Sequence, residues 1–430
     1  MKKIKKIVSS IVIATLPFGL FGCSTSSANL EKPDNTLIAI KKNAAKEGTN
    51  DIYMKYEKDS GFKKIIDKAV LDNQFSNLQY FTDSRALVYQ DSEKNVFMFE
   101  EGKAKTEIAK SPSETIINNK KDIAYIDKNK NLYLKPYGKE KVQIASNVGM
   151  ARLNPDSNQL VYTNDKAELF LTNNGDKTGK KIGTGIKALS FTECKDKILI
   201  TKEDKAVYIK ELKENGKEEK LGNVMNNLFI RMYKDGGVTY FKNIKEKDKK
   251  YFSDLYYKPS GKEEVKIASN VNASPYDFQV VNGVAYYMNN ENKFFSTKLA
   301  TKETKELGKD IVNFMVDEKG NTAYLNNKDN LTVKVEGKEN KNMKANNQVY
   351  TLFNGKIYLL GKDKVLKIDD KVIAKNVEFI QIDKGDIAYY TTDNKLYLLK
   401  GENKSPTKVL DSIKEYDAIF YAGNPLYVKQ

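Results

Sequence analysis

Short apolar runs separated by polar clusters recur along most of this chain, and residues 123–148 show the pattern in its clearest form. The segment contains three apolar runs and two turns, in the order Ile123–Ile126, Asp127–Asn131, Leu132–Leu134, Gly138 and Val142–Val148. Side chains along a β-strand alternate between two faces, and Asn, Asp and Gly supply the backbone conformations of tight turns. The pattern therefore predicts three antiparallel strands joined by two hairpins.

The third run of this segment returns elsewhere in the sequence. Val142–Val148 has a near copy at Val265–Val271. Weaker copies lie at Glu107–Lys110, Lys220–Val224, Glu306–Ile311, Val372–Val377 and Val409–Ile413. The apolar anchors of these copies are about 38 residues apart on average, and self-similarity at such a period indicates a solenoid or a propeller.

Each repeat holds four apolar runs, which is the strand content of one propeller blade. A run that usually contains a tyrosine precedes the first turn, a second run follows that turn, and the copied run comes third. A further run, such as Phe314–Val316 or Phe379–Ile382, leads into the next repeat. Six tyrosines share one repeat position and are expected to fill equivalent places between neighbouring blades: Tyr125, Tyr162, Tyr240, Tyr286, Tyr324 and Tyr389.

The two ends of the chain together supply one more blade. After the last copy the sequence has only two strand-like runs, Ala418–Tyr421 and Pro425–Val428. The missing two are found near the other end, at Ile52–Tyr56 and Phe62–Ile66. A blade assembled from both ends would close a ring and remove the exposed sheet edges. The spacing of apolar residues in Phe62–Val70 also fits a helix, but a strand keeps the register of the repeat.

The sequence thus predicts an all-β protein, a β-propeller of four-stranded antiparallel blades over residues 51–430. Counting gives nine internal units and one shared unit, so we expect one ring of about eight to ten blades, against the four to eight that are typical. Two smaller stacked propellers are the alternative. The lysine-rich stretch Lys242–Lys250 is interpreted as a long loop that breaks the spacing.

Composition removes several classes of active site. The chain contains 26 Tyr and 19 Phe but no Trp and no His. The absence of His excludes Ser-His-Asp and Cys-His mechanisms and all zinc sites that contain His. Of the two cysteines, Cys194 lies between strand-like runs and is expected to be a small buried side chain, so no disulfide framework is predicted.

The N-terminal segment predicts the cellular location of the protein. Lysines precede an apolar run, Ile7–Phe21, with the layout of a secretory signal. The sequence Leu20-Phe21-Gly22-Cys23 resembles the lipobox of bacterial lipoproteins. The resemblance implies a signal peptide over residues 1–22, lipidation of Cys23, a flexible tether over residues 23–50, and a location on the outer face of the cytoplasmic membrane. A secreted protein whose cysteine merely lies near the cleavage site is the alternative.

The repeats also resemble a family. The -IASNV- and -AYY- pieces, as in Ile144–Val148 and Ala388–Tyr390, are similar to those of TolB-like propellers, particularly the Lys/Asn-rich lipid-anchored propellers of clostridia and related bacteria. This resemblance covers residues 51–430. It implies an interaction scaffold outside the membrane and assigns no catalytic residue.

One segment has the spacing of a metal loop. Asp127–Asn131 carries the alternating oxygen ligands of the first half of a calcium loop. Leu132 stands where such a loop needs a glycine, however, and Gly138 where it needs a bidentate glutamate. Hairpin turns require the same residue types, so this segment and its relatives are predicted to be turns. We expect no metal, no cofactor and no catalytic residue, the alternative being an extracellular hydrolase or lyase with carboxylates gathered from several blades.

The formal net charge of +16 is spread over turns along the whole chain. No recognition helix or basic-aromatic motif is present, so nucleic acid is not an expected partner. The expected function is that of a membrane-anchored binding or scaffold propeller for a protein, a peptide or an anionic cell-envelope polymer. The sequence leaves the oligomeric state and the identity of the partner open.

Overall fold

The computed structural model describes residues 36–430 except 57–58, 72–77, 82–85, 174–175, 223–229, 248–249, 274–277, 346, 384, 402–403, 422–423 and 429–430. Within these ranges the chain forms nine four-stranded antiparallel sheets and one five-stranded sheet. The four-stranded sheets are called blades 1 to 9 in chain order, and the five-stranded sheet is called the closing blade. A 3₁₀ turn, η2 (Ile413–Glu415), precedes the last two strands.

The strands of the first four blades follow one another in the sequence. Blade 1 contains β4 (Gln79–Phe81), β5 (Ala86–Gln90), β6 (Val96–Glu100) and β7 (Thr106–Ala109). Blade 2 contains β8 (Glu114–Ile117), β9 (Ile123–Ile126), β10 (Leu132–Lys135) and β11 (Val142–Ala145). Blade 3 contains β12 (Val148–Leu153), β13 (Leu160–Asn164), β14 (Leu169–Thr172) and β15 (Lys180–Gly183). Blade 4 contains β16 (Ile186–Phe191), β17 (Lys197–Lys202), β18 (Val207–Glu211) and β19 (Glu218–Gly222).

Blades 5 to 9 repeat this order. Blade 5 contains β20 (Arg231–Met232), β21 (Val238–Lys247), β22 (Lys250–Lys258) and β23 (Val265–Asn272). Blade 6 contains β24 (Phe278–Val281), β25 (Val284–Met288), β26 (Phe294–Lys298) and β27 (Thr304–Gly308). Blade 7 contains β28 (Ile311–Val316), β29 (Thr322–Asn326), β30 (Asn330–Lys334) and β31 (Lys341–Lys344). Blade 8 contains β32 (Asn347–Phe353), β33 (Lys356–Gly361), β34 (Leu366–Ile368) and β35 (Lys371–Ala374), and blade 9 contains β36 (Val377–Asp383), β37 (Asp386–Thr391), β38 (Leu396–Leu399) and β39 (Thr407–Leu410).

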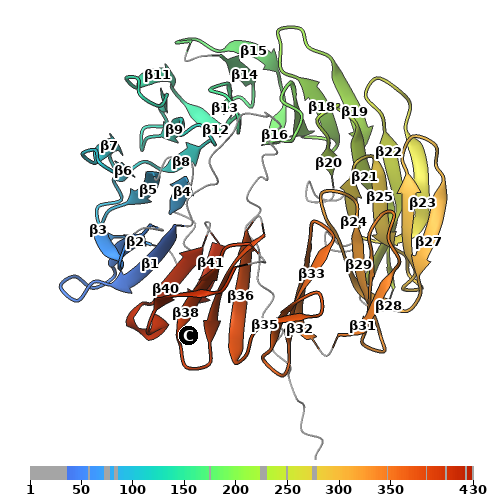
Figure 1. The fold of residues 1–430 in the computed structure, drawn as a ribbon. Helices are drawn as coiled ribbons and strands as arrows, with labels where there is room; N and C mark the ends of the chain where they lie inside the picture. Colours follow the sequence, from blue (N-terminus) through green and yellow to red (C-terminus); the bar gives the residue numbers. More distant parts are fainter. Residues whose placement is uncertain are drawn as a thin grey trace, which may run out of the picture.

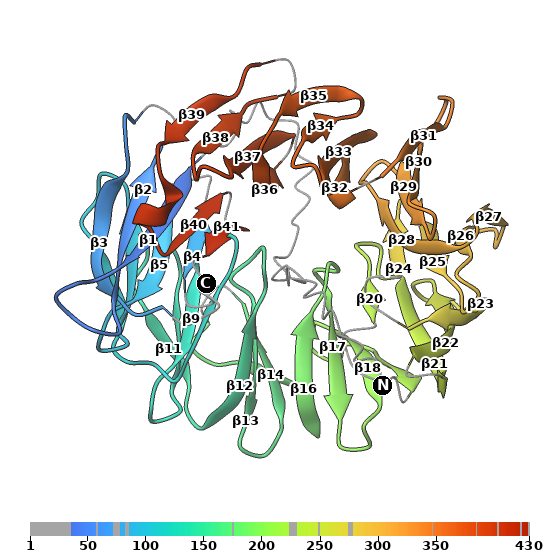
Figure 2. The ribbon, with the colours of Figure 1, turned by 90° about the horizontal axis from the view of Figure 1, so that it is seen from below.

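The ten sheets are arranged in one ring, with the first strand of each of blades 1 to 9 nearest the ring axis (Figures 1 and 2). The prediction of an all-β propeller is confirmed, and the count of nine internal units and one shared unit is correct. The alternative of two stacked propellers is wrong, because the blades follow one another around a single circle (Figure 2).

The closing blade joins both ends of the chain in the order β3-β2-β1-β40-β41. Its strands are β1 (Leu37–Lys42), β2 (Asn50–Lys55), β3 (Lys63–Ala69), β40 (Ala418–Tyr421) and β41 (Asn424–Val428). In Figure 1 the blue strands of the beginning lie beside the red strands of the end. Shared closure was predicted and is confirmed, and the stretch that also fitted a helix is the strand β3.

The predicted boundary of the tether is wrong at its C-terminal side. Residues 37–42 were placed in the tether of residues 23–50, yet they form β1, which pairs with both β2 and β40. The apolar residues Leu37, Ile38 and Ile40 explain the difference, because each is buried in the closing blade. The predicted signal peptide and Cys23 lie outside the described residues.

A second correction concerns the lysine-rich stretch in blade 5. Residues 242–250 were interpreted as a loop, but β21 and β22 extend through most of them as one long hairpin. Lys245 pairs with Phe252 and Glu246 pairs with Tyr251, after a bulge that follows Lys242. The segment has no alternation of apolar and polar residues, and Asn243, Lys245 and Glu246 are exposed, so the sequence did not distinguish this hairpin from a loop.

The predicted hairpin turns are confirmed, and their polar side chains hold the backbone. In blade 2, Asp127 Oδ1 accepts hydrogen bonds from the N–H groups of Asn129 and Asn131, each at 2.8 Å. The turn also fastens one blade to the next, because the carbonyl of Lys130, at φ 60°, accepts a hydrogen bond from Val148 N–H at the start of blade 3. Equivalent bonds join other blades: Ala167 to Ile186, Asn292 to Ile311, and Lys364 to Val377.

The repeated tyrosines pack as predicted. Each of the six is buried on the second strand of its blade. Most stack on an aromatic residue of the third strand, as Tyr125 does on Tyr133 at 5.0 Å between ring centroids and Tyr389 does on Tyr397 at 5.2 Å. Cys194 is buried beside Leu199 and Val207, in agreement with its predicted role as a small core side chain.

Candidate functional site: a lysine-lined cavity at the ring closure

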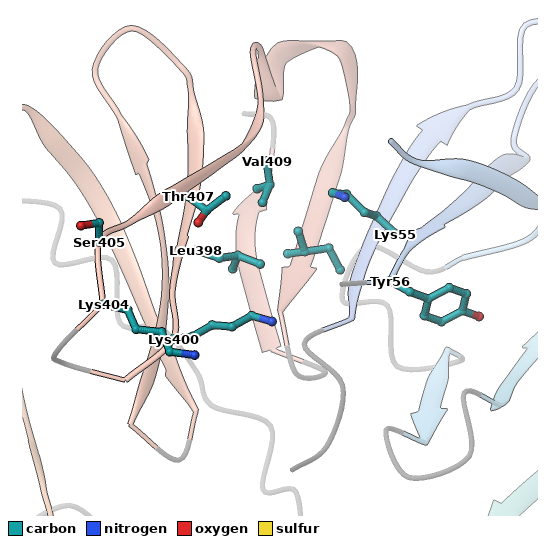
Figure 3. Close-up of a pocket in the computed structure, with 9 residues that line it drawn as sticks. Lys55, Tyr56, Leu398, Lys400, Lys404, Ser405, Thr407 and Val409 are labelled. Atoms are coloured by element: carbon teal, nitrogen blue, oxygen red, sulfur yellow. The ribbon is translucent and has the colours of Figure 1, made fainter. Parts of the chain in front are cut away.

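A cavity of about 290 Å³ lies where blade 9 meets the closing blade. It is lined by Leu37, Lys55, Tyr56, Leu398, Lys400, Lys404, Ser405, Thr407 and Val409. Three lysines, the aliphatic hydroxyl groups of Ser405 and Thr407, the ring of Tyr56 and three aliphatic side chains therefore border one space (Figure 3).

The cavity is built from the first residue of β1 and from one turn of blade 9. Leu37 starts β1 and pairs with Lys55, the last residue of β2. On the other side, Leu398 lies on β38, and Val409 and Thr407 lie on β39. The connection between these two strands carries Lys400, Lys404 and Ser405. The site therefore exists only once the two ends of the chain have met in the closing blade.

The cationic groups reach the cavity from both walls. Lys55 is 7% exposed, and its ammonium group donates a hydrogen bond to the carbonyl of Asp59. Figure 3 shows Lys55 extending from the closing blade and Lys400 from the facing connection, while Tyr56 points away from the space between them. Among the described residues that line the cavity there is no carboxylate. The arrangement suits an anionic group that also accepts hydrogen bonds from Ser405 and Thr407.

A second candidate surface is formed by exposed bulge residues on the first strands, around the ring axis. Several first strands carry a bulge after their first residue, where the register with the neighbouring strand shifts by one. The inserted residue is exposed in each case: Gly149 in blade 3, Lys187 in blade 4, Val312 in blade 7 and Glu378 in blade 9. The flanking anchors, such as Ile186 and Ile311, are uniformly buried. One repeated position thus presents different chemistry in different blades.

The bulge position lies at the opposite end of the strands from the cavity. First strands begin beside the turns between second and third strands, as the bond from Val148 N–H to Lys130 shows. The cavity borders the connection between a third and a fourth strand, β38 and β39. Because neighbouring strands run antiparallel, these two kinds of turn lie at opposite ends of a blade. The ring therefore has a cavity face and a bulge face.

The sequence interpretation missed both features. The cavity combines residues from the two ends of the chain, so no local pattern marks it. The bulge could have been found, since the residue after each first-strand anchor changes while the anchor stays apolar. Arginine could also have pointed to the first strands. The sequence has only three arginines among 73 basic residues, and two of them, Arg152 and Arg231, lie on first strands. Arg152 forms an ion pair with Glu114 of the preceding blade at 3.1 Å.

The carboxylates whose pKa is shifted take part in turns and ion pairs. The hydrogen bond from Lys220, helped by bonds from Ala206 N–H and Tyr208, lowers the pKa of Asp204 to about 2. On a first strand, Glu378 bonds Lys364 of the preceding blade at 2.7 Å. The bonds to Asp204 favour the ionised form of that carboxyl group, whereas a general acid needs a raised pKa. In the part of the chain that is described, His, Cys, Asp and Glu side chains do not gather in threes as a metal site requires.

The described residues contain no helix that is long and apolar enough to cross a membrane. The predicted lipidation site, Cys23, falls outside the described ranges, as stated above. Of the segments singled out in the sequence, Asp127–Asn131 is a turn and Cys194 is a core side chain. The cavity is a candidate site that the sequence did not indicate.

Comparison with known proteins gives no family for the chain: no family model and no curated protein matches it. Among solved structures it is similar to PorZ, an essential bacterial surface component of the type-IX secretion system of Porphyromonas gingivalis (12% identity, TM-score 0.29), with coverage of 88% of this chain and 60% of PorZ. It is also similar to BamB from Moraxella catarrhalis (10% identity, TM-score 0.32; 71% of this chain, 96% of BamB) and to Hsv2 from Kluyveromyces lactis (10% identity, TM-score 0.33; 68% of this chain, 96% of Hsv2). The chain thus spans about three fifths of the length of PorZ.

Proposed function

We propose that the protein is an exported, lipid-anchored β-propeller that binds a protein, a peptide or an anionic cell-envelope polymer at the outer face of the cytoplasmic membrane. The observation that carries the binding role is the bulge face. Its buried anchors repeat from blade to blade, while the exposed residue beside each anchor changes from Gly149 to Lys187, Val312 and Glu378. A scaffold that keeps its packing positions constant and varies one exposed position is suited to recognition.

The exposed residues include a strong candidate for a contact. Val312 is 55% exposed although it lies on a first strand, next to buried Ile311. Lys187 is exposed as well and reaches Glu203 at 3.2 Å, an ion pair that contributes little at such exposure. An apolar and a cationic group on one face favour a partner with apolar and acidic groups.

The binding role is tested by co-sedimentation of the purified protein with isolated cell envelopes. The double variant Lys187→Ala/Val312→Ser should weaken binding by about thirtyfold, because interface residues of this kind each contribute around 1 kcal/mol. The control is Val372→Ser, since Val372 is 48% exposed on the fourth strand of blade 8, far from the axis. Equal binding of wild type, double variant and control would contradict the assignment of the bulge face.

The anchor is tested separately. A Cys23→Ser variant should be released to the medium or remain unprocessed, because the two acyl chains that hold the protein at the membrane would be missing. Fractionation of cells into membrane and medium measures this outcome. Retention of the variant in the membrane fraction at the wild-type level would contradict lipidation at Cys23.

A further inference from the structure

We propose that an asparagine-rich strip on the bulge face of blades 5 to 7 binds a neutral glycan whose sugars carry acetamido groups. This inference rests on the binding role proposed for the bulge face, and it assigns a further ligand class to one arc of that face. The strip, called the amide strip, consists of five exposed asparagines: Asn270, Asn290, Asn292, Asn313 and Asn327. Tyr251, which is 45% exposed, lies at its blade 5 end.

Backbone hydrogen bonds make the amide strip continuous across three neighbouring blades (Figure 2). Each is 2.9 Å long, and they run from Asn290 N–H to the Asn270 carbonyl, from Ile311 N–H to the Asn292 carbonyl, and from Asn327 N–H to the Asp310 carbonyl. The first bond joins the fourth strand of blade 5 to the turn between the second and third strands of blade 6. The other two join that turn and the connection after blade 6 to blade 7. The five asparagines therefore belong to one surface.

The backbone explains only two of these asparagines. Asn270 and Asn292 have φ angles of 55° and 57°, a region that Asn adopts more readily than most residues, so the turns account for them. Asn290, Asn313 and Asn327 have no positive φ. Asn290 and Asn327 share one repeat position, the second residue of the turn, where other blades have different residues: Ser92, Lys128, Asp165, Glu203 and Thr392. The turn itself therefore does not require an amide at this position.

The amide groups of the strip are available to a ligand. Within the described ranges, the five side chains form no hydrogen bond to the protein. An asparagine amide both donates and accepts hydrogen bonds, as an acetamido group and a sugar hydroxyl also do. A row of such amides can therefore bond a glycan without any charged group.

The charges beside the strip favour a neutral ligand over an anionic polymer. In blade 6, Lys293 forms an ion pair with Glu291 at 2.5 Å, and Lys309 forms one with Glu306 at 3.8 Å. In the turn of blade 7, Lys328 is followed by Asp329. Each lysine beside the strip thus has an acidic neighbour, and a polyanion would meet charges of both signs.

Tyr251 supplies an aromatic ring at one end of the strip. It lies on β22 four residues before Leu255, and so on the same side of the strand. Leu255 packs against Phe278 and Ala285 of blade 6, so this side of β22 is the one that faces blade 6 and the strip. The apolar face of a sugar ring can pack on the Tyr251 ring while its polar groups bond the amides. A protein interface would instead need a larger apolar core.

The test titrates the full chain with two neutral hexamers by isothermal titration calorimetry. Chitohexaose carries an acetamido group on every sugar, and cellohexaose carries a hydroxyl group in its place. Chitohexaose should bind, and cellohexaose should bind at least about tenfold more weakly, because it cannot pair with the amides in both directions. The Kd for chitohexaose should be the same at about 50 mM and about 500 mM salt, because the ligand has no charge to screen.

Variants locate the binding site on the strip. Asn290→Ala/Asn327→Ala should raise the Kd for chitohexaose about tenfold, because two hydrogen bonds to the ligand are lost. Tyr251→Ala should raise it about fivefold, whereas Tyr251→Phe keeps the ring and should leave it unchanged. The matched control is Asn129→Ala, which removes an exposed asparagine from the corresponding turn of blade 2 and should also leave the Kd unchanged.

The inference is overturned if chitohexaose does not bind, if both hexamers bind equally well, or if binding falls steeply with salt. Equal losses in Asn290→Ala/Asn327→Ala and in Asn129→Ala would also overturn it, because the site would then lie outside the strip. Co-sedimentation with cell envelopes separates these results from the proposed function. A chain that sediments with envelopes but does not bind chitohexaose keeps the proposed binding role and loses the glycan site. A chain that binds chitohexaose through the strip but does not sediment contradicts the role at the envelope and keeps the glycan site.

Discussion

Blade 2 and the closing blade are both antiparallel sheets of the ring, with four and five strands, but they are assembled differently. The strands of blade 2 all lie between Glu114 and Ala145 and are joined by short hairpins. In the closing blade, Leu37 pairs with Tyr421, and Lys42 N–H donates a hydrogen bond to Asp417 at 2.7 Å across 375 residues. Blade 2 thus depends on local pairing, whereas the closing blade depends on the meeting of the two ends of the chain.

The two blades also differ in how completely they are packed. In blade 2, Leu132 and Leu134 are fully buried in a core shared with blade 3. In the closing blade, Leu37 is equally buried, but one side of it borders the lysine-lined cavity. The closing blade therefore borders a space of this kind where it meets blade 9, whereas Leu132 and Leu134 are enclosed by side chains of blades 2 and 3.

The dependence of the closing blade on both ends of the chain is tested most directly at the contact between β1 and β40. Ile419 is fully buried on β40 and pairs with Ala39 of β1. Ile419→Asp places an unpaired carboxyl in this core and should lower the free energy of unfolding by more than about 4 kcal/mol. Urea unfolding followed by circular dichroism measures the loss.

The control for this variant lies on the neighbouring strand. Val428 on β41 is 47% exposed, so Val428→Asp should change the free energy of unfolding by less than about 0.5 kcal/mol. If both variants were equally stable, β40 would not hold the ring closed, and the closing blade would tolerate separation of the two ends.

A smaller difference is expected between two matched leucines. Leu132→Ala should destabilise the protein by about 2–5 kcal/mol, because it leaves a sealed void in the core between blades 2 and 3. Leu37→Ala should fall at the lower end of this range, since the space it leaves joins an existing cavity. Thermal and urea unfolding of both variants measure the difference. A larger loss for Leu37→Ala would show that closure outweighs the local packing defect.

These two blades also show what the sequence can and cannot predict. The three runs and two turns of blade 2 were predicted from local signals, namely the alternation, the Asp127–Asn131 turn and the near copy at Val265–Val271. The third run was extended too far, because β11 ends at Ala145 and Val148 begins β12 of blade 3. The closing blade was predicted only in part: its existence followed from the count of strands, but Leu37–Lys42 was assigned to the tether. β1 pairs with the adjacent β2 as well as with β40, but it is the fifth strand of this sheet, and a repeat of four strands per unit gave no reason to expect it.

The same reason explains why the sequence did not reveal the candidate site. Lys55 and Lys400 are far apart in the sequence and sit among 73 basic residues, so composition gives no cause to select them. Their proximity follows from ring closure, which the sequence predicted as a topology without fixing which side chains meet. A site at the junction of the two ends can be located only after the register of the closing blade is known.

The smallest expected effect is the dependence of the free energy of unfolding on pH and salt. It is compared at one turn from each blade, at Asp127 and at Asp59. Burial of Asp127 in blade 2 opposes ionisation, but hydrogen bonds from the Asn131 side chain and from the N–H groups of Asn131 and Asn129 outweigh it and lower the pKa. For Asp59 in the closing blade, the hydrogen bond from Lys63 at 2.7 Å is the main cause of a lowered pKa. A lowered pKa adds stability above the unfolded-state pKa of about 3.9, and that stability is lost as the pH falls through the folded-state pKa.

Each turn should therefore contribute less than about 1 kcal/mol of stability that disappears below about pH 4. Asp127→Asn and Asp59→Asn each remove one such contribution, which is measured as a shallower decline in the free energy of unfolding between pH 5 and pH 3 than the wild type shows. At high salt the contribution of Asp59 should shrink, because Lys63 is 69% exposed and the pair is screened. The contribution of Asp127 should persist, because backbone N–H groups in a fixed turn are neutral donors that salt does not screen. Equal salt sensitivity of the two variants would mean that the Asp127 turn also relies on nearby lysines, and the local turns of blade 2 and the closing blade would then be held by the same kind of force.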